Sequence, residues 1–177
     1  MQNDFSKSYF DLFGLEKKFS MQQELLDRAY RNIQLQIHPD KFSHAGEAEK
    51  RLSMQWATRA NEAYQTLKKP LSRARYLLQL HGVDTQEETN TAMPTGFLIE
   101  QMEWREAVME AKLENNHKSL ISLKKKLYLQ RSDMLGNLER QIDADKDLTA
   151  ACVTTRKLRF LEKLAEEIDD AIESAEN

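Results

Sequence analysis

The stretch LLDRAYRNIQLQIHPDKF, residues 25–42, is typical of an amphipathic helix that stops at a proline. Its apolar side chains recur at helical spacing and define one face. That face comprises Leu25, Leu26, Ala29, Tyr30, Ile33 and Ile37. Arg28, Arg31 and Leu35 project from the opposite face. Because a residue that precedes proline disfavours the α conformation, we expect the helix to end at His38.

Further helices are predicted on both sides of this stretch. A second long helix is expected to begin near Glu47, and Pro70 suits the first turn of the next one. Gly82 provides a helix stop, and the aromatic segment 8–16 ends near Gly14. The second helix carries an apolar stripe of Leu52, Trp56, Ala57, Ala60, Ala63, Tyr64 and Leu67.

The composition favours an all-α fold. Only five Gly and three Pro occur among 177 residues, and no alternating apolar pattern lasts long enough for a strand. The single cysteine, Cys152, excludes an internal disulfide and any CxxC site, and its small apolar neighbours predict a buried thiol. No apolar run is long enough to span a membrane and no signal peptide is evident, so we expect a cytoplasmic protein.

The charge distribution indicates two domains. Residues 1–80 carry 13 Lys and Arg against 9 Asp and Glu, whereas residues 81–177 carry 13 against 20. The polar segment 83–96 contains Pro94 and Gly96 and is predicted to be a linker between domains 1–82 and 97–177. The second domain is predicted to form a three-helix bundle. Its expected helices span roughly 97–114, 117–143 and 148–174.

The tripeptide His38-Pro39-Asp40 is the main candidate site. Pro39 fixes the backbone turn, so Asp40 is placed to accept a bidentate bond from a partner's arginine, and His38 adds a donor. Arg28 and Arg31 add positive charge for an acidic surface. This arrangement predicts a binding epitope without a pocket.

Other interpretations of the tripeptide are a plain helix stop, an acid–base pair and a metal site. No neighbouring nucleophile completes a hydrolytic site around His38 and Asp40. His44 does not supply a second imidazole at helical ligand spacing, so we expect no metal and no cofactor. The net basic charge of the first domain is too modest for nucleic acid.

An antiparallel helix pair with His-Pro-Asp at its tip resembles the J domain, and the elements match in order across residues 8–80. The resemblance implies binding to a DnaK-like chaperone ATPase. The implied contact residues are His38, Pro39, Asp40, Arg28, Arg31 and Lys41. Gln36 stands where J domains commonly have lysine, and Leu35 interrupts the charged face, which leaves a thin positive patch.

The whole length resembles the HscB family of co-chaperones for iron–sulfur cluster biogenesis. Four segments carry the resemblance: HPDKF (38–42), NEAYQTLKKPLSRARYLLQLHG (61–82), FLIEQMEWREAV (97–108) and RKLRFLEKL (156–164). It implies a protein that is not an enzyme, that stimulates the chaperone ATPase HscA, and that delivers the scaffold protein IscU. The scaffold-binding positions implied are Leu98, Met102, Glu103, Glu106 and Phe160.

The residues of the second domain leave two questions open. The helix from Phe97 has two apolar stripes, one with Phe97, Trp104, Val108 and Ala111, the other with Leu98, Met102, Met109 and Leu113. Either both stripes pack in the core, or one of them faces a partner. The last helix centres its core stripe on Val153, Leu161, Leu164, Ile168 and Ile172. Phe160 lies at the edge of that stripe, as a flanking core residue or as an exposed anchor, and the resemblance favours the anchor.

Two other functions remain possible from the sequence. The chain is a J protein that serves a different client, or a helical interaction protein in which the tripeptide is only a turn.

Overall fold

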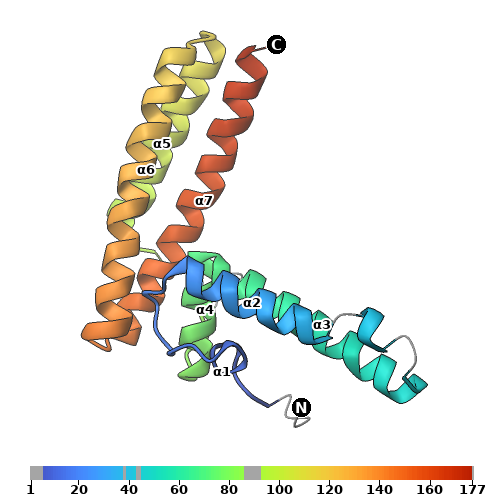
Figure 1. Cartoon of the computed structure of the whole chain (residues 1–177). Coiled ribbons are helices and arrows are strands. Elements are labelled where there is room, and N and C mark those ends of the chain that lie inside the picture. The colour runs from blue at the N-terminus through green and yellow to red at the C-terminus, as the bar shows by residue number, and fades with distance from the viewer. Residues whose placement is uncertain (1–5, 38, 43–44, 86–92, 177) are drawn as a thin grey trace. The chain divides into compact units, whose positions relative to one another are not determined.

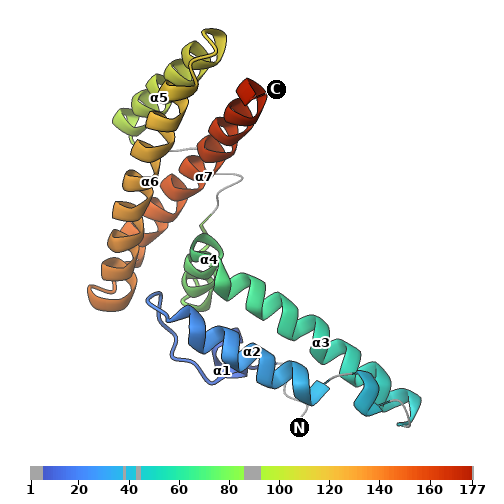
Figure 2. The ribbon, with the colours of Figure 1, turned by 45° about the horizontal axis from the view of Figure 1, so that its top comes forward.

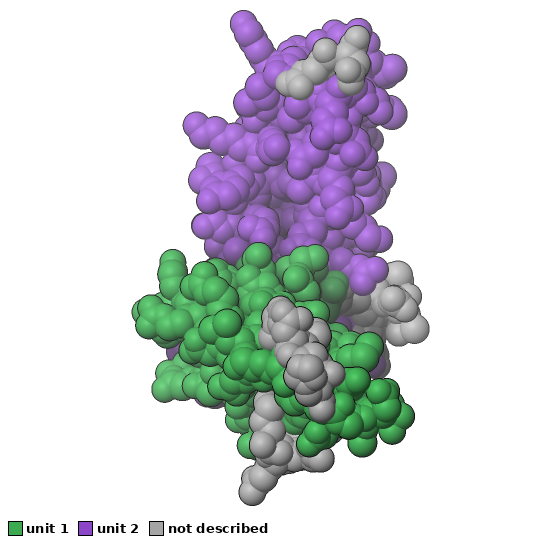
Figure 3. Space-filling model, turned by 45° about the vertical axis from the view of Figure 1, so that its right-hand side comes forward, with its two compact units in different colours: residues 1–77 green, residues 78–177 purple. Residues whose placement is uncertain are grey.

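The structure, a computed structural model, describes residues 6–37, 39–42, 45–85 and 93–176. Every regular element in these ranges is helical, which confirms the all-α class (Figure 1). The chain divides into two compact units, Met1–Leu77 and Leu78–Asn177 (Figure 3). This division falls inside a helix, a few residues before the expected end of the first domain at residue 82.

The first unit begins with a short helix, α1 (Tyr9–Phe13), between two strong local signals. Ser8 and Asp11 form a capping box, in which each side chain bonds the backbone of the other residue. Gly14 ends the helix at a φ of 65°, a left-handed conformation that glycine adopts without a steric penalty. The Tyr9 ring stacks on Tyr76 at 4.5 Å, and the Tyr76 hydroxyl accepts the Tyr9 N–H.

Two long helices, α2 (Gln23–Ile37) and α3 (Glu47–Lys68), lie side by side in this unit (Figures 1 and 2). The Tyr30 and Tyr64 rings stack between them with centroids 4.2 Å apart. Tyr64 Oη donates to Asp27 Oδ1 at 2.9 Å, and Tyr30 Oη donates to Asn61. Stacking and hydrogen bonds therefore fix the register of the pair.

The apolar face of α2 lies slightly to one side of its expected position. Leu26 is fully buried and Ile37 is 4% exposed, but Leu25 is 42% exposed. Leu25 was expected to share the face of Leu26 and Ile37, but two consecutive residues point about 100° apart, so only Leu26 faces α3.

The following helix, α4 (Pro70–Leu80), starts at the predicted proline and is followed by Gly82 at a φ of 75°. Its Arg73 is buried beneath the corner between α3 and α4. The Arg73 guanidinium donates to the Leu67 carbonyl at 2.7 Å and lies 5.1 Å from the Phe19 ring centroid. The Arg73 guanidinium thus supplies a hydrogen-bond donor to one of the carbonyls at the end of α3 that lack a partner within the helix.

The second unit is an antiparallel three-helix bundle, seen in Figures 1 and 2. Its helices are α5 (Thr95–Leu113), α6 (His117–Glu139) and α7 (Leu148–Glu176). The main core cluster comprises Val108, Ala111, Leu120, Leu127, Leu161, Leu164, Ile168 and Ala171. Val153 and Ile172, two of the five residues expected in the core stripe of α7, are only half-buried, because the buried face is centred on the line through Leu161 and Leu164.

The turn after α6 departs from a simple helix end. Residues Arg140–Ala144 form a π-helical turn, where a continuous helix to residue 143 was expected. Asp147 Oδ1 then accepts the Ala150 N–H at 2.9 Å and so caps the first turn of α7. Cys152 is buried as predicted, with its Sγ 4.0 Å from the Asp84 carbonyl oxygen.

Candidate functional site

The His-Pro-Asp tripeptide lies at the connection between α2 and α3. The last helical residue of α2 is Ile37, and Pro39–Phe42 form one turn of 3-10 helix. His38 lies outside the described residues, as do the side chains of Pro39 and Asp40. The backbone therefore turns where the proline predicts, between two helices of the same unit.

The base of this connection is anchored to α3 by residues that the sequence analysis did not assign to the site. Ile37 is buried in a cluster with Trp56 and Ala60. Ser53 Oγ donates to the Ile37 carbonyl oxygen at 2.9 Å in a buried position. This carbonyl is one of the four at the end of α2 that lack a partner within the helix. Ser53 and Trp56 thus hold the backbone immediately before the tripeptide.

The basic residues predicted beside the tripeptide are exposed. Arg28 and Arg31 lie on the solvent face of α2, and Lys41 lies within the 3-10 turn. None of the three makes an ion pair with another described residue. Leu35 is 65% exposed, consistent with its predicted place on this face.

The structure resolves the question of the two stripes on α5. Phe97, Val108 and Ala111 are buried, whereas Leu98 is 39% and Met102 is 61% exposed. The first stripe is therefore core and the second faces solvent. Glu103 and Glu106 are also exposed and make no ion pair with another described residue.

The sequence left open whether Phe160 is a flanking core residue or an exposed anchor, and the side chain has features of both. Its ring is half-buried and meets the buried Phe97 ring edge to face, with centroids 5.9 Å apart. The Lys157 ammonium lies 5.3 Å from the Phe97 centroid. Phe160 thus anchors the start of α5 on α7 and leaves part of its own ring exposed, near the point where the exposed stripe begins at Leu98.

Several exposed apolar residues in this unit were not assigned to a site from the sequence. Ile99, Met109 and Leu113 on α5 are 53%, 62% and 78% exposed. Helical spacing had already placed Met109 and Leu113 on the second stripe, so the signal was present in the sequence. It could not show which stripe faces solvent.

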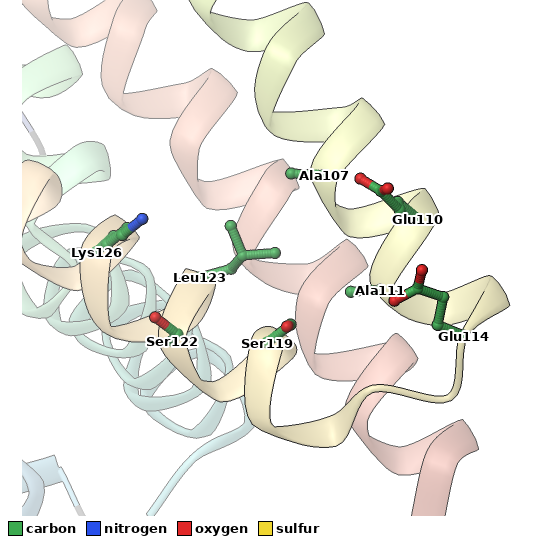
Figure 4. A pocket seen from close by; sticks show the side chains of 8 residues that line it. All are labelled: Ala107, Glu110, Ala111, Glu114, Ser119, Ser122, Leu123 and Lys126. Carbon is green, nitrogen blue, oxygen red and sulfur yellow. The ribbon is translucent and has the colours of Figure 1, made fainter.

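A small cleft between α5 and α6 is lined by two carboxylates, two hydroxyls and one ammonium (Figure 4). The lining residues are Ala107, Glu110, Ala111, Glu114, Ser119, Ser122, Leu123 and Lys126. Within the described ranges, no group of three or more His, Cys, Asp or Glu side chains is arranged to hold a metal ion. None of the described helices has the length and apolar character needed to cross a membrane.

Two protein families match the chain in succession. The DnaJ domain matches residues 8–76, and the HSCB C-terminal oligomerisation domain matches residues 93–169. The co-chaperone protein HscB homolog of Aromatoleum aromaticum is 48% identical over 176 residues, which cover 99% of both chains. The chain belongs to the HscB family of co-chaperones.

Other HscB relatives agree over nearly the full length. The HscB homolog of an Azoarcus species is 47% identical and covers 100% of both chains. Chaperone HscB from Vibrio cholerae has a TM-score of 0.85 at 34% identity, covering 96% of this chain and 99% of the other. Human co-chaperone HscB has a TM-score of 0.88 at 31% identity, covering 94% and 82%. The first unit thus contains a J domain, and the second contains the HscB C-terminal domain.

Proposed function

We propose that this HscB-family protein stimulates the ATPase of a DnaK-like chaperone, HscA, and brings the iron–sulfur scaffold protein IscU to it. The observation that carries the proposal is the order of modules in one chain. A J domain with the HPDKF sequence is followed by a separate bundle whose first helix exposes an acidic and apolar face. The chain acts by binding, and its place of action is the cytoplasm.

The J domain would contact the chaperone through His38, Asp40 and the basic residues beside them. The carboxylate of Asp40 suits an arginine of the chaperone, while Arg28 and Arg31 suit acidic side chains. A bound partner changes an ATPase only if it contacts the hydrolysing state more favourably than the resting state. Ser53 holds the Ile37 carbonyl immediately before the tripeptide, which supports the preorganised contact that such discrimination would need.

The bundle would hold the scaffold through Leu98, Met102 and Phe160, with Glu103 and Glu106 beside them. Exposed apolar side chains next to carboxylates suit a client surface that is apolar and basic. Both partners would then be held by one chain. Such tethering raises their effective mutual concentration, so two modest affinities act together.

The test is single-turnover ATP hydrolysis by the chaperone, measured with this protein, with IscU, and with both. Acceleration that is greater with both proteins than with either alone supports the proposal. Stimulation that does not depend on the scaffold would indicate a J protein for another client. Absence of any stimulation would show that the tripeptide is only a structural turn.

A further inference from the structure

Three large apolar side chains of α6 lie on the side of this helix that faces away from the bundle core. Ile121, Tyr128 and Leu129 are 50%, 67% and 56% exposed. At 100° per residue they fall within an arc of about 100°, opposite the buried Leu120 and Leu127. No other helix of the bundle covers them, so they form an apolar patch that is open to solvent.

Tyr128 is the most exposed member of this patch. Its ring stacks on no other described ring, and its hydroxyl makes no hydrogen bond with another described residue. An exposed tyrosine with a free ring and a free hydroxyl offers both apolar area and a polar handle, and for this reason tyrosine is enriched at protein interfaces.

The polar side chains of the same arc are basic. Lys118 and Lys125 are exposed and make no ion pair with another described residue. The lysines on either flank are occupied: Lys124 Nζ lies 2.6 Å from Asp169 Oδ1 of α7, and Lys126 lines the cleft beside two carboxylates of α5 (Figure 4). The positive charge of the patch therefore comes from Lys118 and Lys125.

We propose that this α6 face, made of Lys118, Ile121, Lys125, Tyr128 and Leu129, is a second contact for the DnaK-like chaperone. It would bind a part of the chaperone surface in which apolar side chains lie beside Asp or Glu. The inference rests on the proposed function, because it adds a contact in the second unit to the one made by the J domain.

Of the two partners in the proposed function, the chemistry of the α6 face fits the chaperone. The J domain would meet acidic side chains of the chaperone through Arg28 and Arg31, and a second basic face suits a surface of the same sign. The scaffold would bind the acidic face of α5 and so carry basic groups, which Lys118 and Lys125 would repel. Because Gln36 leaves the positive patch of the J domain thin, a second contact on the same chain would add to the affinity.

Other occupants fit the α6 face less well. A second copy that docked through the same face would bring Lys125 against like charge. A second copy that docked through its acidic α5 face would have to leave when the scaffold binds there. An anionic membrane would attract Lys118 and Lys125 but repel Asp133 and Glu139, which are exposed further along the same helix.

The experiment is single-turnover ATP hydrolysis by HscA, measured over a range of concentrations of the full-length protein. With Tyr128→Ala and Leu129→Ala together, we expect the concentration that gives half-maximal stimulation to rise about tenfold. Maximal stimulation should stay at the wild-type level, because the J domain contact is unchanged. Lys125→Glu should raise the same concentration several-fold, and more so at low salt than at high salt. The matched control is Lys163→Glu, which makes the same change in net charge at an exposed position of α7 and should have no effect.

Asp40→Asn separates the two ways of failing. If it abolishes stimulation while the α6 variants match the wild type throughout, the second contact is refuted and the proposed function stands. If the wild type does not stimulate HscA at all, the proposed function itself fails.

Three further results would overturn the inference by assigning the α6 face to another occupant. The first is a lower affinity of the Tyr128 and Leu129 variant for IscU in calorimetry. The second is binding of the wild type to phosphatidylglycerol vesicles that this variant has lost. The third is self-association of the wild type in sedimentation that this variant has lost.

Discussion

Ser53 is the residue that links the packing of the J domain to its tripeptide. Its hydroxyl satisfies the Ile37 carbonyl immediately before His38. Ser53→Ala leaves this carbonyl buried without a partner, which costs about 1–3 kcal/mol of unfolding free energy. We expect denaturant unfolding to show this loss, and chaperone ATPase stimulation to fall several-fold because the turn is less firmly held.

Thr58→Ala is the matched control on the same helix. The Thr58 hydroxyl bonds the Met54 carbonyl at an exposed position, so its removal should change neither measurement appreciably. Equal effects of the two substitutions would contradict a positioning role for Ser53.

Ser53 gives a buried polar group a hydrogen-bond partner, whereas Gln101 in the second unit is itself a buried polar side chain with incomplete hydrogen bonding. Its side chain is 4% exposed, and its amide nitrogen has no hydrogen-bond partner among the described residues. A buried donor without a partner destabilises a fold. Gln101→Met should therefore raise the unfolding free energy by about 1 kcal/mol, as measured by chemical denaturation. A lower free energy would show that the amide is satisfied in solution.

At the scale of the helix pair, Asp27 links α2 to α3 and makes the pair sensitive to pH. Hydrogen bonds from Gln23 and then Tyr64 hold the pKa of Asp27 below its ordinary value of 3.8. A lowered pKa stabilises the fold at pH values above the unfolded pKa, and this contribution is lost as pH falls through the folded pKa.

Tyr64→Phe removes one of these donors, so the pKa of Asp27 should rise toward 3.8 in a carboxyl NMR titration. The variant should be less stable than wild type at neutral pH, and the difference should shrink under acid conditions. Tyr128→Phe serves as the control, since Tyr128 is 67% exposed on α6. An unchanged Asp27 pKa in Tyr64→Phe would refute the contact.

The helices were predictable from the sequence to within a few residues, because the chain signals their ends locally. Pro70 starts α4, and Gly14 and Gly82 end helices with positive φ. The π-helical turn at Arg140–Ala144 has no comparable local signal, and it was missed. Periodicity fixes the direction of a face only to within about one residue step of 100°, which explains the errors at Leu25 and Val153.

The candidate site was less predictable than the fold. Arg28, Arg31, Leu98 and Met102 are exposed, and their assignment to binding faces stays a prediction. Ser53 was missed because its role depends on a carbonyl 16 residues away in the chain. The choice between the two stripes of α5 also required the positions of α6 and α7, which no local pattern contains.

At the scale of the whole molecule, we expect two separable binding activities, one for each domain. Leu98→Ala with Met102→Ala should weaken IscU binding by about tenfold or more, because these exposed side chains would be buried against the scaffold. Stimulation of the chaperone by the variant alone should equal that of wild type. This pair is preferable to Phe160→Ala, since Phe160 also packs on Phe97. Loss of stimulation without the scaffold would contradict separate sites.

The most direct test of the central claim is single-turnover ATP hydrolysis by the chaperone in the presence of the Asp40→Asn variant. Truncating one charge of a hydrogen-bonded interface pair costs on the order of 2–5 kcal/mol. We expect hydrolysis no faster than with the chaperone alone, while the variant binds IscU as the wild type does. Hydrolysis accelerated as strongly as by the wild type would show that the Asp40 carboxylate does not act on the ATPase.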